Sequence, residues 1–93
     1  MVYYEAWLGT RKVKADDGEH REYRVEIATP AEKAAPPDYE PLDQKTEKDG
    51  KKVYISKWLQ TIESARNELM SVTRLIESKA CKIVVFFEIR GPC

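Results

Sequence analysis

The side chains best suited to nucleophilic or acid–base chemistry are a single histidine and two cysteines. His20 lies next to a turn signal, Asp17-Gly18. Cys81 begins an apolar segment far along the chain, and Cys93 lies at its end. A nucleophile needs a base within hydrogen-bond reach, and no sequence motif ties these residues together. We therefore expect His20 to be an exposed turn residue, and we assign no catalytic residue.

Patterns of metal-binding residues are equally weak. One histidine and two separated cysteines do not match a zinc-binding spacing. The acidic run Asp16-Asp17-Gly18-Glu19 is much shorter than the calcium-binding loop of an EF-hand, and its residues are more simply explained as turn formers. We expect neither a metal nor a cofactor, and we favour a function other than catalysis.

Two arginines are the strongest candidates for anion binding. If Asp17-Gly18 forms the centre of a type I′ turn, the hairpin register places Arg11 directly opposite Arg24. Facing like charges repel, so either Glu22 and Glu26 neutralise them diagonally or the two arginines clamp a carboxylate or phosphate. We favour neutralisation by the glutamates, because surface ion pairs are common and weak.

A Pro-rich segment carries a short recognition pattern. Pro36-Pro37-Asp38-Tyr39 resembles the Pro-Pro-x-Tyr ligands of WW domains, which present a preformed polyproline helix. We prefer a simpler interpretation, in which the prolines stiffen a loop whose Tyr39 and Leu42 pack back on the sheet. The candidate functional residues of this loop are Pro36, Pro37, Tyr39 and Leu42.

Apolar and aromatic residues predicted on one sheet face are the remaining candidate site: Tyr3, Trp7, Val84 and Phe86. They fit the core of a symmetric dimer, the lining of a small-molecule pocket beneath the loop, or a base-stacking platform for RNA. Sixteen Lys and Arg balance sixteen Asp and Glu, so the basic surplus of a nucleic-acid binder is missing. We rank the dimer first, the pocket second and the stacking platform third.

Turn signals and periodicity predict the elements that position these residues. Alternating apolar residues on both sides of Asp17-Gly18 predict a hairpin up to Thr29. The pattern Thr29-Pro30-Ala31-Glu32 predicts a short helical turn ending at Ala35, followed by a loop without periodicity. Asp49-Gly50 predicts a second turn before a short strand, Lys51–Ile55.

A long helix and a final strand complete the chain. Ser56 is the predicted N-cap of a helix that reaches Ser78. Its apolar stripe consists of Trp58, Ile62, Ala65, Leu69, Val72 and Ile76. Residues 81–89 are apolar on both faces, which is typical of a central strand in a sheet that is covered on both sides. One helix covers one face, so the other cover must be the loop, a ligand or another molecule.

These elements predict an α+β fold in ββ–loop–β–α–β order. We expect a three- or four-stranded mixed sheet in which the C-terminal strand is central and one long helix packs on one face. The 93 residues form a single domain, 1–93, with a Pro-rich loop at about 30–50.

The same sequence gives expectations about location and function. We expect a cytoplasmic protein, because no apolar run could span a bilayer, the N-terminus does not resemble a signal peptide, and the cysteines form no disulfide framework. We expect a homodimeric interaction module without catalysis, with a protein partner and an accessory role for a mobile element, phage or gene cassette. Nucleic acid and membranes are not expected partners. The alternative is a small-molecule-binding protein or minor enzyme that uses a pocket between the sheet and the Pro-rich loop.

Overall fold

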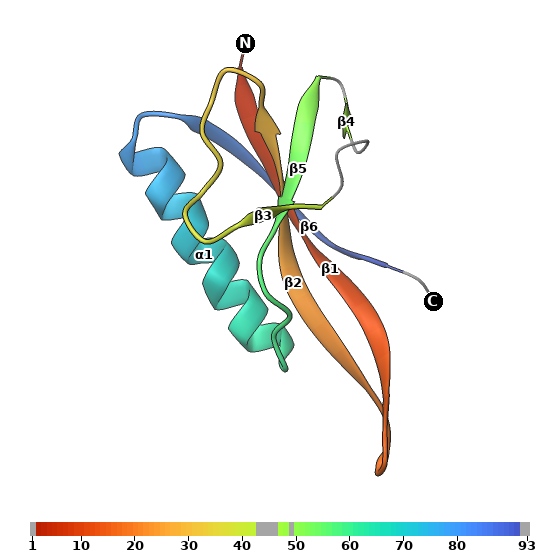
Figure 1. Cartoon of the computed structure of the whole chain (residues 1–93). Coiled ribbons are helices and arrows are strands. Elements are labelled where there is room, and N and C mark those ends of the chain that lie inside the picture. Colours follow the sequence, from red (N-terminus) through yellow and green to blue (C-terminus); the bar gives the residue numbers. More distant parts are fainter. Residues whose placement is uncertain (1, 43–46, 49, 92–93) are drawn as a thin grey trace.

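The computed structural model describes residues 2–42, 47–48 and 50–91. The chain folds into one mixed sheet and one long helix, which confirms the α+β class (Figure 1). Its elements are β1 (Tyr3–Ala15), β2 (Gly18–Pro30), β3 (Glu40–Pro41), β4 (Glu47–Lys48), β5 (Lys51–Ile55), α1 (Ile62–Ser78) and β6 (Lys82–Arg90). The strand order is β3-β5-β2-β1-β6, and β4 also pairs with β5. The sheet therefore has more strands than the three or four predicted, because two short strands form within the Pro-rich segment.

The predicted hairpin is present, but its register differs from the prediction by two residues. Ala15 pairs with Gly18, and Arg11 pairs with Glu22 rather than with Arg24. A type I′ turn needs a positive φ at both central residues. In this turn only Gly18 has one, at 117°, so the turn is of another type. A shift of two residues keeps every side chain on its predicted face and changes only the residue opposite it.

The C-terminal strand is at the edge of the sheet, so its predicted central position is wrong. β6 pairs in parallel with β1 alone, because β2 occupies the other side of β1. The pairing is regular from Tyr3 opposite Lys82 to Ala6 opposite Val85 and then shifts, so that Leu8 lies opposite Ile89. Between these pairs β1 advances by two residues and β6 by four, so β6 bulges. The outer edge of β6 has no strand partner within the described part of the chain.

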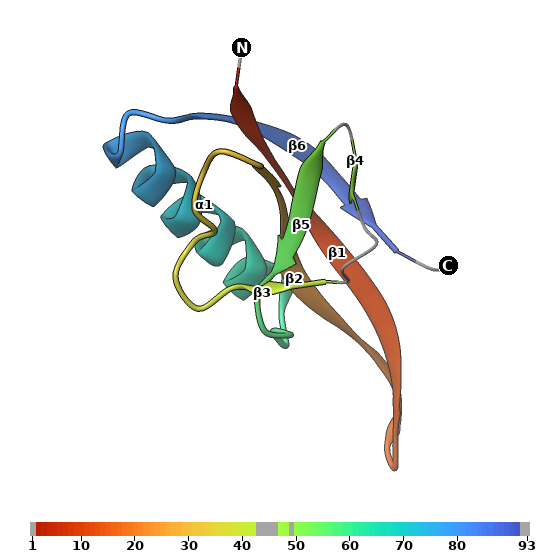
Figure 2. The same ribbon diagram turned by 45° about the horizontal axis from the view of Figure 1, so that its top comes forward.

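Helix α1 ends at Ser78, as predicted, but begins later than predicted. Its N-cap is Thr61, whose hydroxyl accepts a hydrogen bond from the Ser64 backbone N–H over 3.0 Å. The helix covers one face of the sheet (Figure 2). Its buried residues, Ala65, Leu69, Val72 and Ile76, belong to the predicted stripe and pack on Tyr4, Ala6, Leu8, Val25 and Ile27.

The residues just before the helix extend the sheet edge instead of starting the helix at Ser56. The Ser56 backbone N–H donates to the Val25 carbonyl over 3.0 Å, and the Ser56 hydroxyl accepts from the Val25 N–H over 2.9 Å. Farther along, Tyr23 and Leu59 exchange two backbone hydrogen bonds. This pairing with β2 holds the segment extended and delays the helix.

The short helical turn predicted after Thr29 is also absent. Thr29 and Pro30 pair with β5 and extend β2, and a hydrogen-bonded turn follows, in which the Lys33 N–H donates to the Pro30 carbonyl over 3.0 Å. Strand pairing therefore overrides the capping-box pattern. The turn predicted at Asp49-Gly50 lies partly outside the described residues. Gly50 has a positive φ of 77°, and β5 has its predicted bounds.

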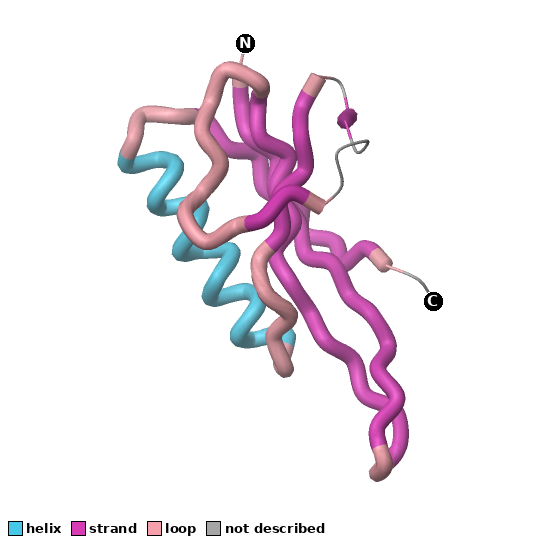
Figure 3. Tube along the Cα trace, in the orientation of Figure 1, coloured by secondary structure: helices cyan, strands magenta, loops and turns pink. Residues whose placement is uncertain are grey.

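The face opposite α1, here called the outer face, carries a smaller apolar cluster. Trp7, Ala28 and Val53 are buried there, and Phe86 packs against them. The hairpin of β1 and β2 extends beyond the helix (Figure 3).

Candidate functional site

The outer face holds a connected set of aromatic, acidic and basic side chains. The Trp7 indole N–H donates to Oε1 of Glu26 over 2.8 Å, and Nε of Arg24 donates to Oε2 of the same carboxylate over 2.9 Å. The carboxylate occupies the space above Gly9, where any Cβ would overlap it. Gly9 therefore leaves room for the Glu26 carboxylate to contact both the indole and the guanidinium group.

Both predicted clamp arginines are paired with glutamates. Arg11 donates two hydrogen bonds to Oε1 of Glu22, over 2.8 and 3.0 Å, and Arg24 is held by Glu26. These are the glutamates that our preferred interpretation assigned to neutralise them, although Arg11 faces Glu22 directly rather than diagonally. The anion-clamp hypothesis gains no support, because an incoming anion would have to displace a carboxylate from each arginine.

Trp58 connects the two arginines and was not predicted to do so. Periodicity assigned it to the helical stripe, whereas it lies in the connection between β5 and α1. The guanidinium carbons of Arg11 and Arg24 are each 4.2 Å from the centroid of its ring. Cation–π contacts of this kind stabilise by about 0.5–1 kcal/mol each at exposed sites. They fasten the connection to the hairpin, and no local sequence signal reveals such a contact.

The residues of the predicted dimer interface differ in how far the chain itself buries them. Trp7 is only 5% exposed, and the guanidinium carbon of Arg90 lies 4.4 Å from its ring centroid. Lys51 covers the Tyr3 ring, with its ammonium nitrogen 3.5 Å from the centroid. Phe86 is half-buried against Trp7, whereas Val84 remains 43% exposed. The chain itself therefore covers much of the predicted surface and leaves the part along β6 open.

The WW-ligand pattern is folded into a turn. Pro36 is buried and its carbonyl accepts from the Tyr39 N–H over 3.3 Å. Asp38 has a positive φ of 68°, which is incompatible with a polyproline helix. The Leu42 N–H donates to the Val53 carbonyl over 3.0 Å, so backbone pairing fastens the end of this segment.

Tyr39 links the Pro-rich segment to the helix. Its hydroxyl donates to Oε1 of Glu68 over 3.0 Å, and its ring packs on the helix-side core. Burial raises the pKa of Tyr39 far above its ordinary value, and the neighbouring Glu68 carboxylate raises it further. Beside this contact is a recess of about 500 Å³ between the Pro-rich segment and the start of α1. It is lined by Asp38, Tyr39, Glu40, Ser56, Lys57, Leu59 and Glu68.

The remaining candidates for chemistry lie apart from one another. His20 is exposed near the hairpin turn. Cys81 follows the helix, with its sulfur 3.6 Å from the Lys79 carbonyl oxygen. Among residues 2–42, 47–48 and 50–91, no three His, Cys, Asp or Glu side chains converge in a way that could hold a metal ion. Over the same residues, α1 is neither long nor apolar enough to cross a membrane.

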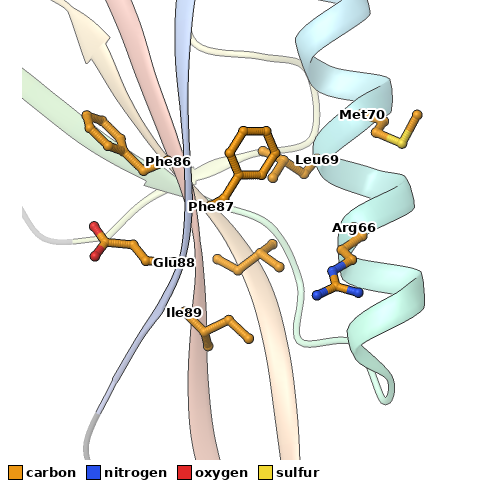
Figure 4. A pocket seen from close by; sticks show the side chains of 8 residues that line it. Arg66, Leu69, Met70, Phe86, Phe87, Glu88 and Ile89 are labelled. Atoms are coloured by element: carbon orange, nitrogen blue, oxygen red, sulfur yellow. The ribbon is translucent and has the colours of Figure 1, made fainter.

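The most exposed apolar surface follows the free edge of β6. Phe87 is 98% exposed, Ile89 is 44% exposed, and Met70 on the facing flank of α1 is 52% exposed. Phe87 points to the helix side of β6, whereas Phe86 and Glu88 point away from it (Figure 4). A groove of about 280 Å³ lies between the strand and the helix, with Leu69 and Arg66 on its helix wall. We call this region, the outer edge of β6 with the facing flank of α1, the β6 surface.

Comparison with known proteins adds no relative. No protein-family model, no curated protein and no solved structure matches this chain.

Proposed function

We propose that this chain is a non-catalytic interaction module that forms a homodimer through the β6 surface. The observation that carries the proposal is the 98% exposure of Phe87 on a strand whose outer edge has no partner among the described residues. A free strand edge presents backbone donors and acceptors that another strand can pair with. Apolar side chains beside such an edge add the area that makes the pairing specific.

The distribution of charge along β6 supports this proposal. Lys82 lies at one end of the strand, and Glu88 and Arg90 lie near the other. The residues between them, 83–87, are all apolar. Edge strands that avoid association usually carry charges in the exposed middle of the strand, whereas β6 carries them only toward its ends. A second copy would also supply the neighbour that the two-sided apolar pattern of this strand requires.

The proposed interface contains part of the predicted one. Val84 belongs to it, and Phe86 borders it, whereas Trp7 supports it from within the chain. A further protein partner and an accessory role for a mobile element stay predictions.

Sedimentation of the unmutated protein and two variants tests the proposal. We expect a dimer at micromolar concentration for the unmutated chain and a folded monomer for Phe87→Lys, because the charge prevents burial of this position. Leu42→Lys is the matched control: Leu42 is 38% exposed, but it lies outside the β6 surface, so the dimer should persist. An unmutated chain that stays monomeric at about 100 µM would contradict the proposal, since a homodimer this weak would be functionally irrelevant.

The small-molecule alternative has one observation in its favour, the recess beside Tyr39 and Glu68. Its partly buried carboxylate and phenol could orient a polar ligand. The alternative predicts that a fragment mixture shifts NMR signals of the recess residues while leaving those of β6 unchanged. Shifts confined to β6, or none at all, would remove it.

A further inference from the structure

We infer that the second copy adds antiparallel to β6 in a single register, in which Lys82 of each copy faces Glu88 of the other. This inference rests on the proposed function and deepens it, because it specifies how the partner pairs. It follows from the order of charged and apolar residues along β6, from the face on which each side chain lies, and from the charges on the flank of α1.

The charges of β6 select the register. When two identical strands pair antiparallel about a two-fold axis, residues at equal distances on either side of the axis face each other. An axis at Val85 places Lys82 opposite Glu88 twice, once on each side. An axis one residue later places Lys82 opposite Arg90, and such facing like charges repel. An axis one residue earlier leaves Glu88 opposite Ala80, which lies outside the strand.

The apolar residues match in the same register. Ile83 faces Phe87 of the second copy, Val84 faces Phe86, and Val85 faces its own equivalent. Cross-strand pairs of aromatic and β-branched residues are favourable contacts in antiparallel sheets. Phe87, which its own chain leaves almost wholly exposed, thereby gains a neighbour on the helix side of the extended sheet.

This register also places both helices on the same face of the joined sheet. Facing residues in an antiparallel pair point to the same side, so a residue on the helix side of one copy must face a helix-side residue of the other. Phe87 lies on that side (Figure 4), and so does Ile83, which packs against the helix-side core. A shift of the pairing by a single residue would instead pair helix-side with outer-face residues and put the helices on opposite faces.

The flank of α1 is complementary to itself in this arrangement. Arg66 lines the groove beside residues 86–89, at one end of the β6 surface. Glu77 lines a recess beside residues 82–84, at the other end. Since the two copies run in opposite directions, Arg66 of one lies at the same end as Glu77 of the other. The helix charges therefore favour the same antiparallel arrangement as the strand charges.

A charge-reversal experiment tests the register. In a Lys82→Glu homodimer, two glutamates meet on each side of the axis, and in a Glu88→Lys homodimer two lysines do. Each single variant should raise the dimer dissociation constant about tenfold or more, because two favourable pairs become repulsive. An equimolar mixture of the two variants should form a heterodimer close to unmutated affinity, since both facing pairs are again of opposite charge.

Two further samples complete the design. The double variant Lys82→Glu with Glu88→Lys should dimerise with itself. Lys12→Glu and Glu19→Lys are the matched controls, because both positions are exposed on the hairpin and neither variant should change the dissociation constant. Glu88 also pairs with Arg90 of its own strand. In the mixture, the Glu88→Lys chain still lacks its contact with Arg90. Recovery of affinity in the mixture therefore reports pairing between chains.

The results distinguish the register from the proposed function. A dimer in which single variants bind as tightly as the unmutated chain, or in which mixing restores nothing, overturns the register and leaves dimerisation through β6 standing. A monomeric unmutated chain overturns both. Recovery in the mixture and in the double variant supports the register.

Discussion

The indole N–H of Trp7 and the guanidinium Nε of Arg24 donate to the two oxygens of one carboxylate, that of Glu26, over 2.8 and 2.9 Å. Trp7 is buried, and the side chains of Arg24 and Glu26 are only 15% and 16% exposed. Side chains of β2 thus supply both the acceptor for the Trp7 indole N–H and the guanidinium group that holds this acceptor in place.

Glu26→Ala should lower the free energy of unfolding by about 2–3 kcal/mol, because it leaves a buried indole N–H and a largely buried guanidinium group without their acceptor. Glu26→Gln should cost less, since its amide oxygen still accepts from Trp7. Glu19→Ala, at an exposed position on the same strand, should change stability by no more than about 0.5 kcal/mol. Urea denaturation measures all three. Equal effects of the Glu26→Ala and Glu19→Ala variants would contradict this account.

Tyr39 should make stability fall at alkaline pH. Burial, and then the Glu68 carboxylate, hold the pKa of Tyr39 well above its ordinary value of 10.0. The unfolded chain loses this phenolic proton near pH 10, whereas the folded chain keeps it. The contribution to stability is therefore complete below about pH 10 and decreases as the pH rises above that value.

Urea midpoints at a series of alkaline pH values measure this decrease. Glu68→Gln should make it shallower, because removing the charge brings the pKa of Tyr39 closer to its ordinary value. Tyr39→Phe should remove this part of the decrease. A remainder is expected from Tyr4, whose pKa is also raised, first by burial and then by Cys81. An unchanged slope in both variants would show that Tyr39 does not carry the effect.

Thr29→Val should stabilise the protein by about 1 kcal/mol. Thr29 is 2% exposed, and its hydroxyl oxygen has no hydrogen-bond partner among the described residues. Valine has nearly the same shape without the unsatisfied group, so replacing it removes a desolvation cost. Thr10→Val is the control, because the Thr10 hydroxyl donates to the Glu22 carbonyl over 3.0 Å, and its loss should destabilise. Thermal unfolding compares the two variants; destabilisation by Thr29→Val would mean that the hydroxyl has a partner.

Sequence patterns predicted well which face of a helix or strand is buried, but poorly which residues lie opposite one another on neighbouring strands. The part of the predicted stripe from Ala65 to Ile76 is buried, since helical periodicity determines which side of a helix is apolar. In the hairpin, Val25 and Ile27 alternate with polar residues, and both are buried. Alternation has a period of two, however, so a register shift of two residues leaves it unchanged. For that reason the residue opposite Arg11 could not be read from the pattern.

Interactions between distant segments account for the other differences. Ser56 and Thr61 are both good N-cap residues, and pairing of Ser56 with Val25 decides between them. The apolar residues on both faces of β6 indicate cover for both faces, but they do not indicate whether the same chain provides it. Two-sided apolarity therefore suggested a central strand, whereas β6 lies at an edge and leaves Phe87 exposed.

Ala80→Gly should stabilise the protein by about 1 kcal/mol. Ala80 follows the end of α1 with a positive φ of 59°, a conformation that is strained for a residue with a Cβ and natural for glycine. The hydrogen bonds are those of a Schellman motif, with the Cys81 N–H donating to the Ile76 carbonyl and the Ala80 N–H to the Glu77 carbonyl, over 3.2 and 2.9 Å. Ala31→Gly is the control, since Ala31 is exposed in a turn without a positive φ; there the extra freedom of the unfolded chain should destabilise by a few tenths of a kcal/mol. Thermal and urea unfolding of the two variants should therefore shift in opposite directions, and a loss of stability in Ala80→Gly would mean that the helix does not end in this conformation in solution.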